Sequence, residues 1–349
     1  MAGLKDILTP QYVATYWENN PQLVEPYFGE SKFPNVKQLG LRLSYIKGAN
    51  NAPVRLSASQ FDADVIKLKR QGFEALSMEM PYFKNAYTMD ETTRQDLLLI
   101  QASGNTAMRD IVMNRVFNDE ARLVANARLT AETLRMEALT TGAIVIEDNG
   151  VSKAYDFGVP AEQKVTLSGT NVWSDAENAD PIKDINDWKL QLSQKGIALE
   201  EILMNSTTLN LLTKVQSIKD KVALYAISGS GATLTTATVK QVILAETGVT
   251  IYVYDKGYML EGTFVKFVPD NLVVAMPSKT LGNTYFGTTP AEADLMDGSK
   301  AADSVSVVET GVTLARDSNA DPVWKRLIAS MVCLPSFEEA NSIVIATVA

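Results

Sequence analysis

Few side chains in this sequence could carry out chemistry near neutral pH. The chain of 349 residues has no histidine, which removes the usual general base and the commonest metal ligand. Its single cysteine, Cys333, cannot form an intrachain disulfide or a zinc site built on several thiolates. Because Cys333 lies in an apolar stretch, we interpret it as a buried residue and not as a nucleophile. The sequence therefore predicts no cofactor, no metal and no catalytic residue.

Three motifs approach ligand-binding patterns but are incomplete. Gly229-Ser230-Gly231 lacks the Gly-Lys-Ser/Thr that completes a nucleotide-binding loop. The acidic cluster of residues 175–184 and the alternating oxygen donors of residues 317–321 lack the mid-loop glycine and closing glutamate of a calcium loop. We expect a flexible loop and solvated turns at these places. A hydrolase built on two of the 41 acidic residues remains an alternative that composition does not remove.

Composition describes a globular, acidic protein. Hydrophobic residues make up 46% of the chain and charged residues 21%, which is enough apolar material for a sizeable core. The net charge of −9 is opposite to that of a protein that binds phosphate backbones, so it fits a container for nucleic acid better than a binder. No apolar run approaches the ~20 residues of a membrane span, and the start does not read as a signal peptide. We expect no membrane contact and a cytoplasmic site of action.

The N-terminal part of the chain predicts two extended segments without a core of their own. Residues 1–36 form an arm interrupted by prolines and rich in aromatic residues, which must pack on the same chain or on a neighbour. Residues 37–80 show the period-two alternation of a long β-hairpin. Seven basic residues between positions 37 and 70 stand against two acidic ones, Asp62 and Asp64. The basic hairpin is either a solvated face or a projecting arm that lies across an acidic neighbour.

Periodicity predicts a long helix and then an α/β lobe. The helix covers residues 117–140, ends at Gly142, and places Arg128, Glu132 and Arg135 on its exposed side; a shorter helix covers residues 92–101. A hairpin turning at Asn149-Gly150 follows. The remaining expectations are helices at 182–194, 206–218 and 236–245, strands at 198–204 and 249–254, loop over most of 276–310, and strands at 304–308 and 343–348 that return to the first lobe.

Several motifs, in this order and spacing, resemble the lambda-like major capsid proteins of tailed phages. They are Leu139 to Gly142, Asp156-Phe157-Gly158, Gly169 to Trp173 with Asp180-Pro181, Tyr252 to Tyr254, Phe267-Val-Pro-Asp-Asn271, Thr284-Tyr-Phe-Gly287 with Ala291 to Asp294, and Ile328 to Pro335. Residues 262–287 carry most of the likeness and read as strand, turn and strand. The resemblance covers most of the chain and is best in its second half.

The resemblance implies an α+β chain with the HK-ninety-seven-type phage capsid fold. Its parts are an N-terminal arm (1–36), an extended hairpin loop (37–80), a peripheral domain (81–182) with a spine helix at about 117–140, an axial α/β domain (183–275), and a return to the peripheral domain (276–349). The implied protein is not an enzyme. It is a structural shell protein that assembles as hexamers and pentamers into the icosahedral head around double-stranded DNA. A nanocompartment shell of encapsulin type is the alternative within the same fold.

The same resemblance implies partners and a contact surface. The partners are other copies of the chain, a separate scaffolding protein, a portal and a possible decoration protein, and the location is the virion capsid after assembly in the host cytoplasm. We expect the basic hairpin of one subunit to lie over acidic residues on the long helix of the next. The residues expected at this contact are Arg42, Lys47, Arg55, Lys67, Lys69 and Arg70 on one side and Asp119, Glu120, Glu132 and Glu137 on the other.

Overall fold

A computed structural model describes most of the chain. The described residues are 26–47, 74–89, 106–148, 150–227, 234–299, 304–321 and 323–349, with the single positions 10, 15, 91, 95 and 99. The predicted helix at 92–101 and the loop at 229–231 therefore lie largely outside the described residues, as do most of the arm and the middle of the basic hairpin. Two compact units emerge. The first draws on Met1–Ser44, Ser77–Arg135 and Asn283–Ser336, and the second on Tyr45–Leu76, Met136–Gly282 and Phe337–Ala349.

The first unit is built on a mixed sheet in which β16 (Val323–Pro335) is the central strand. Along the sheet the order is β1-β13-β16-β15-β14, and β4 pairs with β16 as well. The β1–β13 pair is parallel, and the other pairs are antiparallel. The remaining bounds are β1 (Asn35–Lys37), β4 (Tyr82–Met89), β13 (Thr284–Phe286), β14 (Val305–Val308) and β15 (Val312–Ala320).

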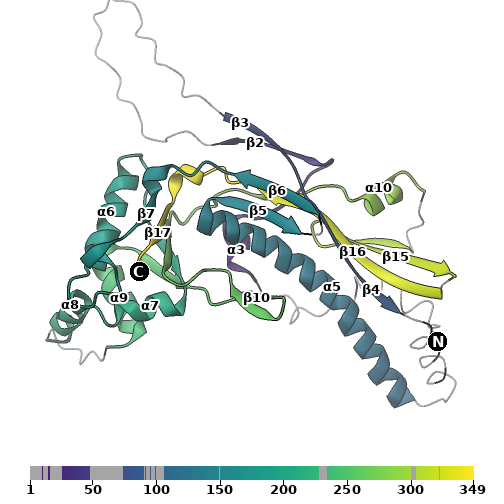
Figure 1. Ribbon diagram of the computed structural model, residues 1–349, viewed down its shortest axis with the longest axis horizontal. Helices are drawn as coiled ribbons and strands as arrows, with labels where there is room; N and C mark the ends of the chain where they lie inside the picture. Colours follow the sequence, from purple (N-terminus) through teal and green to yellow (C-terminus); the bar gives the residue numbers. More distant parts are fainter. Residues whose placement is uncertain are drawn as a thin grey trace, which may run out of the picture. The chain divides into compact units, whose positions relative to one another are not determined.

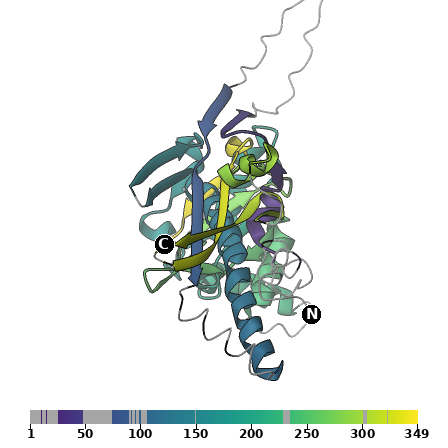
Figure 2. The ribbon, with the colours of Figure 1, turned by 90° about the vertical axis from the view of Figure 1, so that its right-hand side faces the viewer.

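A single long helix, α5 (Thr106–Thr141), packs on one face of this sheet (Figures 1 and 2). Its Leu123 and Val124 are buried against Leu314 and Leu327 of the strands. The helix begins earlier than predicted because its 36 residues contain no glycine or proline to interrupt it. It ends where predicted: Gly142 has φ +77°, and its amide donates to Ala138 O at 2.9 Å.

Two short helices complete the first unit. The helix α3 (Phe28–Lys32) lies against α5, and α10 (Pro290–Met296) begins with a capping box between Thr289 and Glu292. The capping box stabilises α10 within the segment that was expected to be mostly loop.

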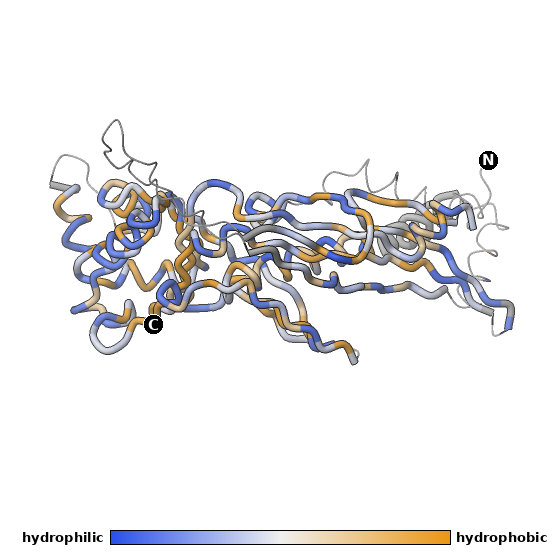
Figure 3. The backbone as a smooth tube through the Cα atoms, turned by 90° about the horizontal axis from the view of Figure 1, so that it is seen from above, coloured by the Kyte–Doolittle hydropathy of each residue, from blue (hydrophilic) through white to orange (hydrophobic). Residues whose placement is uncertain are grey.

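The second unit has a five-stranded sheet in the order β7-β17-β12-β8-β9 with helices packed on it. The strands are β7 (Lys164–Thr166), β8 (Glu201–Met204), β9 (Thr250–Val253), β12 (Leu272–Met276) and β17 (Val344–Thr347), and the helices are α6 (Pro181–Ser193), α7 (Ser206–Leu212), α8 (Gln216–Ile227) and α9 (Thr236–Thr247). Hydrophilic and hydrophobic segments alternate along these helices in Figure 3, as expected for helices with one face on a core. Short 3₁₀ turns lie at Ala161–Gln163, Gly169–Asn171 and Ala340–Ser342.

The structure corrects two expectations about this unit. The terminal strand β17 belongs to its sheet and not to the first lobe, because alternate residues Val344, Ala346 and Val348 enter its core. The predicted helix at 206–218 is two helices, α7 and α8. The chain turns between them because Val215 is fully buried and Gln216 N donates to Ala176 O at 2.7 Å.

Three hairpins complete the described chain. The predicted hairpin at Asn149-Gly150 is β5 (Ala143–Asp148) with β6 (Val151–Asp156). The strand-turn-strand segment predicted at 262–276 is also present, but its strands have different partners: β11 (Thr263–Lys266) pairs with β10 (Gly257–Leu260), whereas β12 joins the five-stranded sheet. The third pair, β2 (Arg42–Lys47) with β3 (Glu74–Glu79), forms the two ends of the basic hairpin.

Candidate functional site

The described residues contain neither a cluster of metal ligands nor a reactive thiol. No group of three or more histidine, cysteine, aspartate or glutamate residues that could hold a metal ion occurs among them. Cys333 is fully buried, and burial raises the pKa of its thiol to about 12, so the thiol stays protonated near neutral pH. No described helix is long and apolar enough to cross a membrane.

The acidic motifs are used locally. Asp180 caps α6 by accepting a hydrogen bond from Lys183 N, and Asp184 accepts one from the indole Nε1 of Trp173 at 2.9 Å. Burial raises the pKa of Asp184. Asp317 forms an ion pair with Arg326 at 2.8 Å across the β15–β16 ladder. These contacts account for the carboxylates as parts of turns, helix starts and strand pairs.

A buried polar network holds α3 on α5 in the first unit. The carboxylate of Glu132 accepts a hydrogen bond from Gly29 N at 2.8 Å and pairs with Arg135 Nη1 at 3.3 Å. Both side chains of this pair are buried, with exposed fractions of 0% and 1%. The prediction that Arg128, Glu132 and Arg135 face solvent was therefore wrong. Helical spacing correctly identified the Glu132–Arg135 pair, but it could not show that α3 covers this pair.

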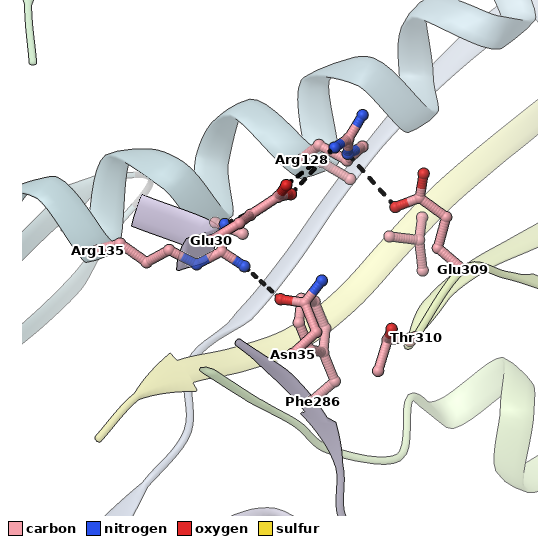
Figure 4. Close-up of a pocket in the computed structure, with 11 residues that line it drawn as sticks. Glu30, Asn35, Arg128, Arg135, Phe286, Glu309 and Thr310 are labelled. Carbon is pink, nitrogen blue, oxygen red and sulfur yellow. Dashed lines mark hydrogen bonds and ion pairs between the residues drawn. The ribbon is translucent and has the colours of Figure 1, made fainter. Parts of the chain in front are cut away.

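The two arginines connect the network to the rest of the first unit (Figure 4). Arg135 donates from Nε to Thr284 Oγ1 at 2.8 Å and from Nη2 to Asn35 Oδ1, which ties α5 to β1 and β13. Arg128 pairs with Glu30 at 3.0 Å and with Glu309 at 3.5 Å. The charged groups that line part of the pocket in Figure 4 are thus paired with one another within the chain.

Few of the residues expected at an intersubunit contact can be placed in the structure. Arg42 is exposed on β2, whereas the side chain of Lys47 and all of Arg55, Lys67, Lys69 and Arg70 lie outside the described residues. The backbone of Asp119 and Glu120 is helical, but their side chains are likewise outside the described part.

The two remaining acidic residues of that set are engaged within the chain. Glu132 is excluded as a surface contact because it is fully buried and fully engaged. Glu137 is half-buried and accepts a hydrogen bond from Val145 N at 2.9 Å; burial raises its pKa and this hydrogen bond opposes the rise.

Sequence reasoning did not identify the exposed apolar residues of the described surface. They include Leu39 and Leu41 before β2, Leu224 on α8, and Met259, Leu260 and Phe264 on the β10–β11 hairpin. The sequence signal that could have identified the hairpin was a pair of short apolar segments on either side of Glu261-Gly262.

Comparison with known proteins decides the family. The sequence model of the phage major capsid protein E family matches residues 9–348. The chain belongs to this family. No curated protein sequence matches the chain significantly. As a member, the chain is the major structural protein of the icosahedral head shell of a tailed phage, copies of it assemble with one another, and its location is the virion capsid.

Solved structures with the same fold support this placement. A putative prophage capsid protein from E. coli CFT073 is similar with a TM-score of 0.54 at 16% identity, over 79% of this chain and 80% of that one. A phage-related protein from Bordetella bronchiseptica RB50 gives a TM-score of 0.54 at 13% identity, over 97% and 96% of the two chains. The capsid protein of cyanophage A-1(L) gives 0.50 at 14% identity, over 90% and 89%. At these identities the likeness shows the capsid fold.

Proposed function

We propose that the chain assembles as hexameric and pentameric capsomers and that residues 37–80 are a principal contact between neighbouring subunits. The observation that carries this proposal is the β2–β3 pair, whose strands pair only with each other among the described strands. A two-stranded ribbon is marginally stable alone, and Leu39 and Leu41 beside it are 71% and 53% exposed. Packing against an adjacent subunit would bury these side chains.

Charge gives the proposed contact its preference for an acidic surface. The segment carries Arg42, Lys47, Arg55, Lys67, Lys69 and Arg70 in a chain of net charge −9. Lys37, the first basic residue of the segment, is already paired with Glu292 at 2.6 Å and is not part of the contact. On the next subunit we propose acidic residues of the first unit as the acceptor, with Asp119 and Glu120 as the candidates that the sequence offers. Glu132 is not part of it.

The two units take different roles in this proposal. The first unit, with its sheet and long helix, is the peripheral domain, and the helical lobe of residues 183–275 is the axial domain. The strand β17 completes the sheet of that lobe. A separate scaffolding protein, a portal and a decoration protein are the further partners, and the enclosed DNA is not recognised by sequence. We propose no enzymatic activity, on the basis of the absent histidine and the protonated Cys333.

Electron microscopy of the expressed protein tests the proposal. The full chain is produced alone and together with the head genes next to it, and the particles are imaged and sized by sedimentation. Rings of six and five subunits, or closed shells, are the expected result. Only compact monomers at high concentration, with the neighbouring head proteins present, would contradict it. A protein shell filled with a cellular enzyme and encoded without a portal gene would favour the nanocompartment alternative.

A further inference from the structure

The β10–β11 hairpin of the second unit closes through a tight two-residue turn. Its strands pair in register, with Met259 opposite Phe264 and Leu260 opposite Thr263. The two tip residues, Glu261 and Gly262, have φ values of +48° and +83°, the signs that a tight two-residue hairpin turn requires. The ring of Phe264 lies over Gly257, where an added Cβ would be 2.8 Å from Phe264 Cζ, so glycine gives the ring its place.

Aromatic packing fixes the base of the hairpin to the unit. The buried ring of Phe267, which follows β11, stacks on Tyr254 with centroids 5.8 Å apart and an interplanar angle of 11°. The ring of Tyr258 on β10 contacts the same Phe267 at 5.8 Å. Phe267 N also donates to Lys256 O at 3.0 Å. The hairpin therefore presents its side chains at low conformational cost.

The side chains it presents are large and apolar. Met259, Leu260 and Phe264 are 64%, 55% and 54% exposed. The strands β10 and β11 pair only with each other among the described strands. Met259 and Phe264 are a cross-strand pair on one face of the hairpin, and Leu260 lies on the other face. Large exposed apolar residues on a preformed element mark an interaction surface.

A complementary apolar position lies elsewhere on the same unit. On α8, Leu224 is 60% exposed and Tyr225 is 38% exposed, and the Tyr225 hydroxyl is held by Glu246 Oε1 at 3.1 Å. In Figure 1, α8 and the β10–β11 hairpin lie on opposite sides of the five-stranded sheet of this unit. Two different complementary patches on opposite sides of a subunit are the arrangement that generates head-to-tail rings.

We propose that the β10–β11 hairpin of one subunit docks on α8 of the adjacent copy, with Phe264 as its anchor and Leu224 as its partner. This inference rests on the proposed capsomer. The occupant is a second copy because shell assembly supplies one beside every subunit. The size of the patch agrees: three side chains bury far less than the roughly 800 Å² per partner of a stable pairwise complex, so the contact serves only when repeated around a closed ring.

Site-directed disulfides test the contact. In the double variant Phe264→Cys/Leu224→Cys, mild oxidation of assembled protein is expected to give covalent oligomers up to ring size that collapse on reduction. The α8 helix and the β10–β11 hairpin are separated by the five-stranded sheet in Figure 1, so we do not expect a bond within one chain to compete. The native Cys333 is buried with a pKa of about 12 and adds little background. The matched control is Phe264→Cys/Leu190→Cys, because Leu190 on α6 is 59% exposed.

The outcomes separate the two proposals. Docking on α8 is supported if the Phe264→Cys/Leu224→Cys variant gives a ladder of covalent oligomers and the Phe264→Cys/Leu190→Cys variant gives none. Normal capsomers with no ladder, or equal ladders from both pairs, overturn the docking and leave the proposed capsomer intact. If the unmodified chain forms no capsomer, both proposals fall.

A second pair of variants separates folding from assembly. Met259→Ser/Phe264→Ser is expected to keep the far-ultraviolet circular dichroism and thermal midpoint of the parent but to reduce capsomer yield by about tenfold or more, the usual effect of losing an interface anchor. Leu190→Ser is the matched control and is expected to assemble normally. Normal assembly of the double serine variant would overturn the inference.

Discussion

The amide of Gly29 donates a 2.8 Å hydrogen bond to the carboxylate of Glu132, which lies 103 positions further along the chain and is fully buried. The carboxylate also pairs with Arg135, so one buried charge fixes α3 and orients an arginine that reaches β1 and β13. A buried charge with every partner in place is tolerated, whereas one deprived of a partner is costly.

The first prediction follows from this arrangement. Glu132→Ala leaves the buried Arg135 guanidinium with only the more distant carboxylate of Glu30, at 3.8 Å, and leaves Gly29 N–H without its acceptor. We expect a loss of about 3 kcal/mol in the free energy of unfolding, measured by urea denaturation. Glu132→Gln keeps an acceptor oxygen and should lose less. Glu147→Ala, on the exposed part of β5, is the control and should change stability by less than about 0.5 kcal/mol. Equal stability of the two alanine variants would contradict the structural role of Glu132.

The second prediction concerns the close approach of α3 to α5. A Cβ added at Gly29 would lie 2.5 Å from Glu132 Oε2 and 3.0 Å from Arg135 Cβ. Gly29→Ala should therefore displace α3, at a cost of about 1–3 kcal/mol in the free energy of unfolding, and should expose the chain near Phe33 to limited proteolysis. The control Ser31→Ala changes an exposed residue of the same helix and should leave the proteolysis pattern unchanged.

The third prediction concerns the basic segment. Reversing Lys67, Lys69 and Arg70 to glutamate should block capsomer formation while the subunit stays folded, as seen by sedimentation and circular dichroism. Each exposed ion pair contributes only ~0.2–1 kcal/mol, so the effect comes from repetition around the ring. Raised salt should weaken early capsomer contacts of the parent for the same reason.

A matched reversal controls for the change in net charge. Lys84, Lys214 and Lys325 are exposed on the described surface, and their reversal to glutamate changes the net charge equally. We expect this control to assemble. If both triple variants assemble normally, the basic segment is a solvated face.

The fourth prediction concerns Cys333. Burial raises the pKa of its thiol to about 12 in the folded chain, above the ~8.5 of an exposed cysteine. The folded state therefore holds a proton that the unfolded state releases as the pH rises. This contribution to stability is complete below about pH 8.5 and is lost progressively as the pH approaches 12. At pH 8, a thiol reagent should leave the folded protein unmodified and react once per chain in urea, and rapid labelling of the folded chain would disprove the burial.

Local pattern identified the elements whose partners are close in sequence. Gly142 ends the long helix, Gly150 supplies the positive φ of a hairpin turn, and Asp180-Pro181 starts α6, because each depends on its own backbone conformation or cap. The family resemblance supplied the shell function, which no single side chain reveals.

What the sequence could not supply were contacts between distant segments. Helical spacing alone placed Glu132 on the surface, because its covering partner Gly29 is remote. The apolar residues of 344–348 predicted a strand, but the pattern within one strand does not show which other strands it pairs with. The exposed side chains of the β10–β11 hairpin were missed for a related reason, since an apolar strand is ordinarily assumed to be buried.

The two units are interleaved along the chain, and this has a consequence for synthesis. In the first unit, Asn35 of β1 pairs with Thr284 of β13, so β1 waits for a partner made long afterwards. In the second unit, β17 lies between β7 and β12, so the sheet has a gap until residues 344–347 are made. A nascent chain that has reached Gly282 has completed neither unit. Contacts of such long range slow folding, and they defer the appearance of finished, mutually adhesive surfaces until residues 344–347 have been made, so that partly made chains do not yet present them.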